Sequence, residues 1–494
     1  MSITCCLPVV ECVYCLACAR WVWQRCLHSG GYDSETWGVA SAEEFEPVPR
    51  LCRIILSVYE DDLENPQWAP PGGYGMEPRW VVQRRIYEDT HGHAPTYLLY
   101  VDHQHSDVVL AVRGMNMAKE SDYAVLLDNK LGQRRFDGGY VHNGLLKAAE
   151  WVFDAECDVL KDLLERNPGY TLTFAGHSLG SGVVSMLALL AVHNRELLGG
   201  IDRKRIRCFA MAPARCMSLN LAVRYADVIN AVILQDDFLP RTDIPLEDIF
   251  KSLFCLPCLL CGRCLIDTCI PESVMLRDPR RLYAPGRLYH IVERKPFRYE
   301  FAFIFFPERN MQVMLAISTE LESGCYGQNN KILNVEFIIF IETIPDCCRC
   351  GRYPPIVRTA VPVDGRFERI VLSCNATSDH AIIWIEREAQ RALDLLLESE
   401  KTMQAPAVER MSSEITVTRD HDEEQQEALR RAIMLGVADV NMPSTYGTFN
   451  ENPTSEPAEA SPLLSDSGRR RAVWEEWIAR IFEKDESGQM VPRR

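Results

Sequence analysis

The sequence predicts an α/β fold, with a mostly parallel sheet whose strands are joined by crossover helices. Strand-like apolar runs alternate with helical patterns through the middle of the chain, which is typical of parallel sheets. One of these runs, at residues 170–175, leads through a glycine-flanked serine directly into a helix of small and apolar residues. Together the two observations indicate a folded core between about residues 96 and 400.

The individual elements follow from the spacing of their apolar residues. Short runs rich in aliphatic residues predict strands at 107–113, 170–175, 206–212, 228–234, 288–292 and 369–372. Helices are expected at 144–164, 181–193 and 381–398. In the first of these, apolar side chains recur at helical spacing, at Leu145, Leu146, Ala149, Val152 and Phe153.

The composition is that of a globular protein with an acidic charge balance. Of its 494 residues, 47% are hydrophobic and 25% are charged, and the formal net charge is −16. This charge argues against nucleic-acid binding, which needs a basic surface for the phosphates. Most of the 20 cysteines cluster at positions 5–26, 255–269 and 347–350, and the N-terminus lacks the basic segment of a signal peptide. We therefore expect a reducing, cytoplasmic compartment rather than a disulfide framework.

Three regions are expected along the chain. Residues 1–95 form an N-terminal extension, which begins with an apolar segment rich in cysteine and tryptophan at 1–27. Residues 96–400 form the α/β domain, with a cysteine-rich insertion at about 246–345. Residues 401–494 are rich in Ser, Glu, Pro and Asn and should be largely disordered, except for an amphipathic helix at 469–483.

The segment Gly176-His-Ser-Leu-Gly180 matches the nucleophile elbow of the α/β-hydrolase fold. The serine of this turn has a strained backbone, so the residues two positions away must be nearly free of side chain. The turn exposes the hydroxyl and directs the next amide toward a developing oxyanion. Because the motif lies here between a strand and a helix, it favours Ser178 as a catalytic nucleophile over a structural glycine-rich turn.

A serine nucleophile needs a base to take its proton, and that base needs an acid to orient it. The chain order in this fold is serine, acid, histidine. Asp237 follows the strand at 228–234 and is the predicted acid, with Asp236 as its nearest competitor.

Three histidines follow Asp237 in the chain. His380 is the predicted base, because it lies on a loop after the strand at 369–372 and such a loop can reach the elbow. His290 lies inside a buried strand, where a hydrogen-bonded core role is expected. His421 lies in the acidic tail, where nothing would hold it in place.

The developing oxyanion needs two backbone amide donors. Leu179 supplies one as the residue after the nucleophile. The other is expected from Met115, on the loop after the strand at 107–113, where Gly114 allows a close approach of the backbone. This chemistry requires no metal and no cofactor.

Together these motifs resemble the class 3 lipase family, in particular its plant members and the sn-1-specific diacylglycerol lipases. The resemblance covers roughly residues 1–400 and rests on segments 112–114, 141–145, 176–180, 237–240, 284–292 and 378–380. It implies that Ser178, Asp237 and His380 form the catalytic triad and that Met115 occupies the oxyanion position, where the family usually carries Thr or Ser. The first 95 residues look like the extension of plant mono- and diacylglycerol lipase-like proteins, and the insertion falls where diacylglycerol lipases carry a regulatory loop.

The cysteine clusters leave three interpretations open. The spacing of Cys255, Cys258, Cys261 and Cys264 suggests zinc or iron–sulfur ligation, although no histidine is nearby. The same cysteines suit an apolar, membrane-contacting lid, with palmitoylation, or plain burial. This reasoning extends to the N-terminal cluster Cys5, Cys6, Cys12, Cys15 and Cys18.

The predicted helix at 469–483 is basic at its start and apolar on one face. Three arginines at 469–471 precede an apolar stripe formed by Val473, Trp474, Trp477, Ile478, Ile481 and Phe482. Such a helix suits a membrane surface, a calmodulin-like partner at Arg469–Phe482, or docking on the protein's own core.

The sequence therefore predicts a serine lipase that hydrolyses an acyl ester of a mono- or diacylglycerol. We expect it to be attached peripherally to a cytosol-facing membrane, where its glycerolipid substrate lies. A phospholipase A1 or a galactolipase is the alternative within the same family. The alternative of another class is a membrane-recruited, calmodulin-type interaction protein whose hydrolase core is vestigial.

Overall fold

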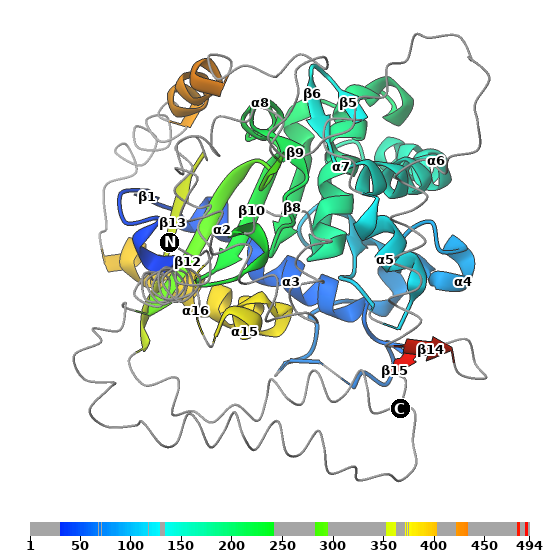
Figure 1. Cartoon of the computed structure of the whole chain (residues 1–494), viewed down its shortest axis with the longest axis horizontal. Coiled ribbons are helices and arrows are strands. Elements are labelled where there is room, and N and C mark those ends of the chain that lie inside the picture. Colours follow the sequence, from blue (N-terminus) through cyan, green and yellow to red (C-terminus); the bar gives the residue numbers. More distant parts are fainter. Residues whose placement is uncertain are drawn as a thin grey trace, which may run out of the picture.

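The computed structural model describes residues 30–67, 69–70, 72–116, 118–128, 134–241, 282–294, 352–361, 371, 373, 375–402, 421–432, 482–484 and 490–492. Most of them build one large twisted sheet that has helices on both faces (Figure 1).

Within the described residues the central sheet has nine strands, in the order β1-β13-β12-β10-β8-β7-β4-β3-β2. The five adjacent strands β12, β10, β8, β7 and β4 run parallel, and the outer strands pair antiparallel. The predicted α/β-hydrolase fold, with a mostly parallel sheet and crossover helices, is thereby confirmed. The strands are β1 (Gly38–Val39), β2 (Val81–Arg85), β3 (Tyr97–Asp102), β4 (Asp107–Val112), β7 (Thr171–His177), β8 (Ile206–Met211), β10 (Ile229–Leu234), β12 (Arg287–Arg294) and β13 (Arg352–Ala360).

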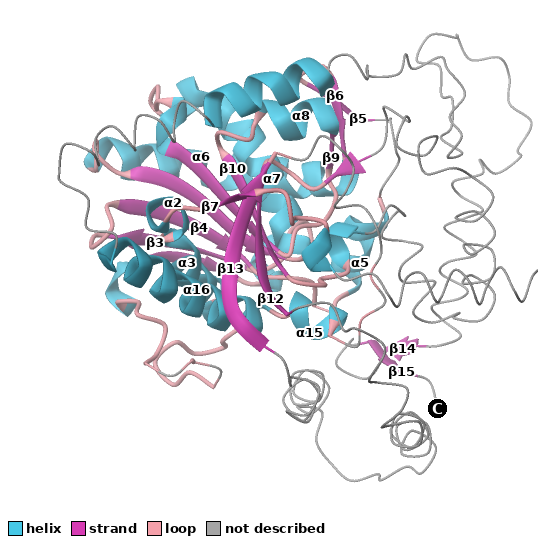
Figure 2. Ribbon diagram, turned by 90° about the vertical axis from the view of Figure 1, so that its left-hand side faces the viewer, coloured by secondary structure: helices cyan, strands magenta, loops and turns pink. Residues whose placement is uncertain are grey.

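Four long helices cover the two faces of this sheet. Helices α6 (Asn143–Arg166) and α7 (Leu179–His193) lie on one face, and α3 (Pro47–Ser57) and α16 (Ile382–Thr402) lie on the other (Figure 2). In β4, Val108, Leu110 and Val112 belong to the first layer, whereas Val109 and Ala111 belong to the second. Because both faces are buried, the strand is apolar at every position after Asp107.

Shorter elements complete the described structure. A second sheet has the order β11-β9-β6-β5 and contains Leu282–Tyr283, Met217–Ser218, Gly139–Val141 and Arg134–Phe136. The short helices are α2 (Ala42–Phe45), α4 (Tyr87–Thr90), α5 (Glu120–Leu127), α8 (Leu219–Arg224) and α15 (Ala376–His380). One further hairpin pairs β14 (Phe482–Lys484) with β15 (Met490–Pro492).

The N-terminal region belongs to the same fold, which corrects the boundary predicted at residue 95. Its strands β1 and β2 form the two opposite edges of the central sheet. Between them, α3 packs across one face of the sheet with nine of its eleven residues buried. Residues 30–95 therefore complete the sheet and cover it, and they do not form a separate unit.

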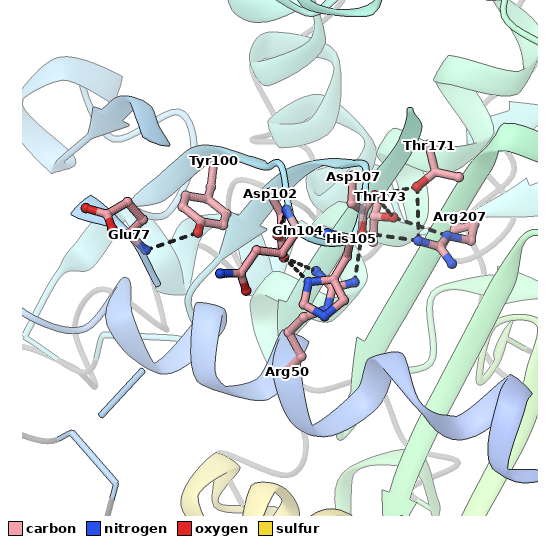
Figure 3. Close-up of polar contacts among 10 residues, drawn as sticks. All are labelled: Arg50, Glu77, Tyr100, Asp102, Gln104, His105, Asp107, Thr171, Thr173 and Arg207. Carbon is pink, nitrogen blue, oxygen red and sulfur yellow. Dashed lines mark hydrogen bonds and ion pairs between the residues drawn. The ribbon is translucent and has the colours of Figure 1, made fainter. Parts of the chain in front are cut away.

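Arg50 fastens α3 to one end of the sheet (Figure 3). Its guanidinium donates to Asp102 at 2.8 Å and to Asp107 at 3.0 Å. Asp107 is fully buried, so its carboxylate must be compensated by hydrogen bonds. Its other donors, at 2.7 to 3.1 Å, are Thr171, Thr173 and Arg207.

Two described segments in the second half of the chain differ from what the sequence led us to expect there. The insertion expected at 246–345 is not continuous, because β12 lies between β10 and β13 in the central sheet. In the tail expected to be largely disordered, the described residues 421–432 are helical. This segment buries Ala428 and Ala432 in the core, and its Glu424 pairs with Arg287 at 2.8 Å.

Several predictions concern residues outside the described part of the chain. These are the segment 1–27 with its cysteines, the cluster Cys255–Cys264, the strand at 369–372 except Val371, and the tail helix up to Ile481. The last two residues of that helix, Phe482 and Glu483, lie in β14 instead. Among the described helices none is both long and apolar enough to cross a membrane. Membrane attachment and a calmodulin-like partner stay predictions.

Candidate active site

Ser178 lies at a sharp turn between the end of β7 and the start of α7. Its backbone has φ 54° and ψ −118°, a conformation that non-glycine residues rarely adopt. The turn is possible because two glycines flank it. A Cβ on Gly176 would lie 2.4 Å from the Gly180 carbonyl oxygen, and a Cβ on Gly180 would lie 2.3 Å from that of Arg113. The sequence predicted this strained elbow.

The structure brings the three predicted triad residues together. The His380 Nε2 atom lies 2.8 Å from the Ser178 hydroxyl, and the His380 Nδ1 atom lies 3.0 Å from Asp237 Oδ1. Asp237 is fully buried, whereas the His380 side chain is 17% exposed. The Asp237 Oδ1 atom also accepts the Leu239 amide at 3.1 Å. One imidazole therefore bridges a hydroxyl and a buried carboxylate.

His380 is the last residue of the short helix α15 and does not lie on a loop, as the sequence had suggested. At the end of α15 the Ala381 amide donates to the Ser378 carbonyl, and this hydrogen bond fixes the backbone of His380. The Phe238 ring packs against the imidazole, with 5.0 Å between the ring centroids. These contacts hold the imidazole between Ser178 and Asp237.

Asp237 follows β10 on a tight turn that begins with Gln235. Gln235 has φ 35°, and its carbonyl accepts hydrogen bonds from Arg241 at 3.0 Å and from His290 Nε2 at 2.8 Å. Asp236, the competitor for the role of acid, accepts the Gly30 amide at 2.8 Å instead. The turn is thus held by the side chains of Arg241 and His290 and by a backbone amide of the N-terminal region.

His290 has the core role that its strand position predicted. Its Nδ1 atom lies 2.7 Å from the Ser34 hydroxyl, and its Nε2 atom bonds to the Gln235 carbonyl. Burial, with a further contribution from the charge of Arg241, lowers the pKa of His290 to about 3. The neutral ring therefore donates from Nε2 and accepts at Nδ1, so both nitrogens are engaged in holding the turn.

The loop predicted to carry the second oxyanion donor lies against the elbow. The Gly114 amide donates to the Tyr59 hydroxyl at 2.7 Å, and the Asn116 amide donates to Asp122 Oδ2 at 2.7 Å. Met115 lies between these two anchored amides. Leu179 is the first residue of α7, where backbone amides have no partner within the helix.

Asp122 is a buried anchor of this loop. Its Oδ2 atom accepts the Tyr87 hydroxyl at 2.7 Å as well as the Asn116 amide. Burial raises the pKa of Asp122 to about 6, because desolvation disfavours the charged form. Met115 has no hydroxyl that could help to hold the loop, and the hydrogen bonds of Asp122 hold it instead.

His177, inside the elbow motif, lies against the same loop. Its Nδ1 atom is 3.0 Å from the Tyr59 hydroxyl, and its Nε2 atom is 2.7 Å from the His380 carbonyl oxygen. Burial, together with the proximity of His380, lowers the pKa of His177 to about 3. His177 is therefore a neutral imidazole beside the candidate base.

Sequence reasoning missed the residues that hold this site. His177 was visible within the motif, but its partners were not. Tyr59 and Ser34 are remote in sequence from the residues they contact, and Asp122 joins the nearby Asn116 to Tyr87, 35 positions away. No local pattern marks these three residues. Among the described residues, no group of three or more His, Cys, Asp or Glu side chains is placed to bind a metal ion.

Comparison with known families gives two matches. Residues 109–246 match the family described as Lipase (class 3), and residues 9–76 match the Lipase 3 N-terminal region. The first match contains the elbow, Asp237 and the loop around Met115. The second contains α3 and Tyr59.

The chain is also similar to individual proteins. It is 26% identical to diacylglycerol lipase-beta of Mus musculus over 167 residues, which are 32% of this chain and only 23% of that protein. The structure of the Rhizomucor miehei triacylglyceride lipase is 14% identical, with a TM-score of 0.35, over 51% of this chain and 82% of the other. A lipase from Rhizopus microsporus var. chinensis is 12% identical, with a TM-score of 0.36, over 52% and 78%.

The first matched segment contains the elbow between β7 and α7 and several strands of the parallel sheet behind it. The matches over residues 9–76 and 109–246 support membership of the class 3 lipase family.

Proposed function

We propose that this protein is a serine lipase that hydrolyses an acyl ester of a mono- or diacylglycerol. The observation that carries the proposal is the continuous hydrogen-bond path from the Ser178 hydroxyl through His380 to the buried Asp237. A serine hydroxyl is a poor nucleophile unless a base takes its proton, and this path supplies the base and its orienting acid.

In the proposed reaction, Ser178 Oγ attacks the ester carbonyl while its proton moves to His380 Nε2. The new C–O bond forms, and the carbonyl oxygen becomes an oxyanion that the Met115 and Leu179 amides stabilise. Collapse of this intermediate breaks the ester bond, and His380 returns the proton to the leaving glycerol oxygen. Asp237 keeps the Nδ1 proton in place and stabilises the imidazolium.

The second half of the reaction repeats these roles with water. His380 takes a proton from a water molecule, which attacks the acyl-serine carbonyl. The fatty acid leaves and Ser178 regains its proton. The choice of a glycerolipid is supported by the family and by the partial similarity to diacylglycerol lipase-beta.

The test uses the full chain and a fluorophosphonate probe, which reacts with activated serines. The wild type should be labelled, and Ser178→Ala should lose both labelling and ester hydrolysis, by a factor on the order of 10⁴ or more. Labelling that survives in Ser178→Ala would contradict the assigned nucleophile.

A substrate panel then tests the lipid class. Fatty acid release is measured from micelles of monoacylglycerol, diacylglycerol, phosphatidylcholine and galactolipid. Preferential release from the first two is expected. An enzyme that is labelled but prefers phosphatidylcholine or galactolipid would keep the mechanism and reject the substrate.

A further inference from the structure

A chain of hydrogen bonds connects the oxyanion loop with the backbone of the candidate base. The Gly114 amide bonds to the Tyr59 hydroxyl at 2.7 Å, and that hydroxyl bonds to His177 Nδ1 at 3.0 Å. On the other side of the ring, His177 Nε2 bonds to the His380 carbonyl at 2.7 Å. Four segments that are distant in sequence thus meet beside Ser178.

Chemistry fixes the direction of every bond in this chain. The Gly114 amide can only donate, so the Tyr59 oxygen accepts there and its single proton goes to His177 Nδ1. The His380 carbonyl can only accept, so His177 Nε2 must carry a proton. The chain is complete only with the neutral, Nε2-protonated form of His177.

We propose that Tyr59 and His177 are positioning residues that hold the oxyanion loop and His380 at a fixed separation. The proposal rests on the proposed function, because the loop and the base matter only if Ser178 reacts. Neither side chain bonds to the Ser178 hydroxyl. They act through Gly114, the neighbour of Met115, and through the backbone of His380.

The packing around Gly114 leaves little freedom for another arrangement. A Cβ on Gly114 would lie 2.7 Å from the Tyr59 hydroxyl oxygen and 2.8 Å from His177 Nδ1. The loop backbone is therefore in direct contact with both side chains. Loss of a bond here would let the loop shift, and a misplacement of about 1 Å can cost about 100-fold in rate.

The uncharged state of His177 also suits the reaction. The rings of His177 and His380 lie 5.1 Å apart between centroids. When His380 accepts the serine proton it becomes a cation, and a second cation at this distance would oppose that step. A neutral imidazole holds the His380 backbone without this repulsion.

Tyr59→Phe tests the chain because it separates the hydroxyl from the ring. The ring also contacts the Arg113 guanidinium at 4.6 Å from its centroid, and phenylalanine can keep this contact. With a short, soluble ester as substrate, we expect kcat to fall by about 10- to 100-fold and KM to change by less than about twofold.

Tyr100→Phe is the matched control. Tyr100 lies buried on β3, and its hydroxyl also accepts a backbone amide, that of Glu77 at 3.2 Å, in place of an amide of the oxyanion loop (Figure 3). This variant should lose some thermal stability and keep kcat within about twofold of wild type. Equal kcat values for Tyr59→Phe and Tyr100→Phe would overturn the proposal.

His177→Gln gives a second, independent test if Tyr59→Phe folds poorly. The glutamine amide can still donate to the His380 carbonyl. It has no acceptor at the position of His177 Nδ1, so the hydrogen bond from the Tyr59 hydroxyl is lost. Because both substitutions interrupt one chain, the double variant should lose no more activity than the worse single variant. Multiplied losses would overturn the proposal.

Labelling with the fluorophosphonate probe separates this proposal from the proposed function. A wild type that is neither labelled nor active rejects the function, and the positioning role with it. An active wild type whose kcat is insensitive to Tyr59→Phe and His177→Gln rejects the positioning role alone.

Discussion

The Asp236 amide donates a hydrogen bond to Asp379 Oδ2 at 3.0 Å, and this contact joins the two segments that carry the candidate acid and the candidate base. Asp236 directly precedes Asp237, and Asp379 directly precedes His380. The distance between the Asp237 carboxylate and the His380 imidazole is therefore set by the hydrogen bond between Asp236 and Asp379, as well as by the hydrogen bond between Asp237 and His380.

Asp379→Ala removes this acceptor, and we expect kcat to fall by about tenfold or more because the imidazole loses its alignment on Asp237. Asp379→Asn keeps an acceptor oxygen in the same place and should retain most of the activity. The two variants are compared by steady-state hydrolysis of a soluble ester. Equal losses in both would indicate that the charge, and not the contact, is what matters.

His290 and His380, two of the histidines that follow Asp237 in the chain, should respond differently to substitution. His380→Ala should abolish hydrolysis as completely as Ser178→Ala, because the serine then has no base. His290→Gln should mainly lower the Tm, because Gln235 loses a buried donor. Thermal unfolding and fluorophosphonate labelling of both variants are the measurements. A folded His290→Gln protein without labelling, beside an active His380→Ala protein, would reverse the assignment.

Gly180→Ala should prevent correct folding of the elbow. The added Cβ would lie 2.3 Å from the Arg113 carbonyl oxygen and 2.6 Å from that of Val112, both of them backbone atoms that cannot move away cheaply. Gly169→Ala is the control, since a Cβ there would meet nothing within 4 Å. Soluble yield and Tm are compared. A Gly180→Ala protein as stable as the control would contradict the tight packing of α7 against β4.

Asp122 should make stability depend on pH. Folding raises the pKa of Asp122 from 3.8 to about 6, so the folded state binds its proton more tightly than the unfolded state. The resulting stabilisation is fully present below about pH 4 and is lost as the pH rises through about 6. Asp122→Asn imitates the protonated group and should remove this contribution.

The measurement for Asp122 is the difference in Tm between wild type and Asp122→Asn from pH 4 to pH 7. We expect the wild type to lose stability relative to the variant as the pH rises. Asp154→Asn, on the exposed surface of α6, controls for the change in net charge. A constant difference across this range would show that Asp122 does not titrate there.

Local pattern accounts for much of what the sequence could predict. The runs that became β4, β7, β8 and β10 are mostly apolar because helices bury both faces of the sheet. Ser178, Asp237 and His380 could be predicted as candidates because the motif fixes the serine and the fold fixes the order of its partners.

What could not be predicted depends on contacts between distant segments. The role of β1 and β2 as sheet edges appears only when the whole sheet is assembled, and so do the contacts of Tyr59 and Ser34. The helical segment at 421–432 was missed because most of its residues are charged or polar. Its few apolar positions, among them Ala428 and Ala432, become meaningful only against the core that buries them.

The position of β1 beside β13 has a consequence for how the chain is made. The Arg358 side chain donates to the Gly31 carbonyl across 327 positions of sequence, and β1 pairs with the strand that contains Arg358. During synthesis the first of these segments leaves the ribosome long before the second exists. The growing chain must therefore carry residues 30–39 without their partner strand until Arg358, 327 positions after Gly31, has been translated. In the described central sheet the first and the last strand of the chain are neighbours. Pairing over so long a sequence separation slows folding and leaves the edge of β13 without its partner for longer, which favours aggregation of the incomplete fold.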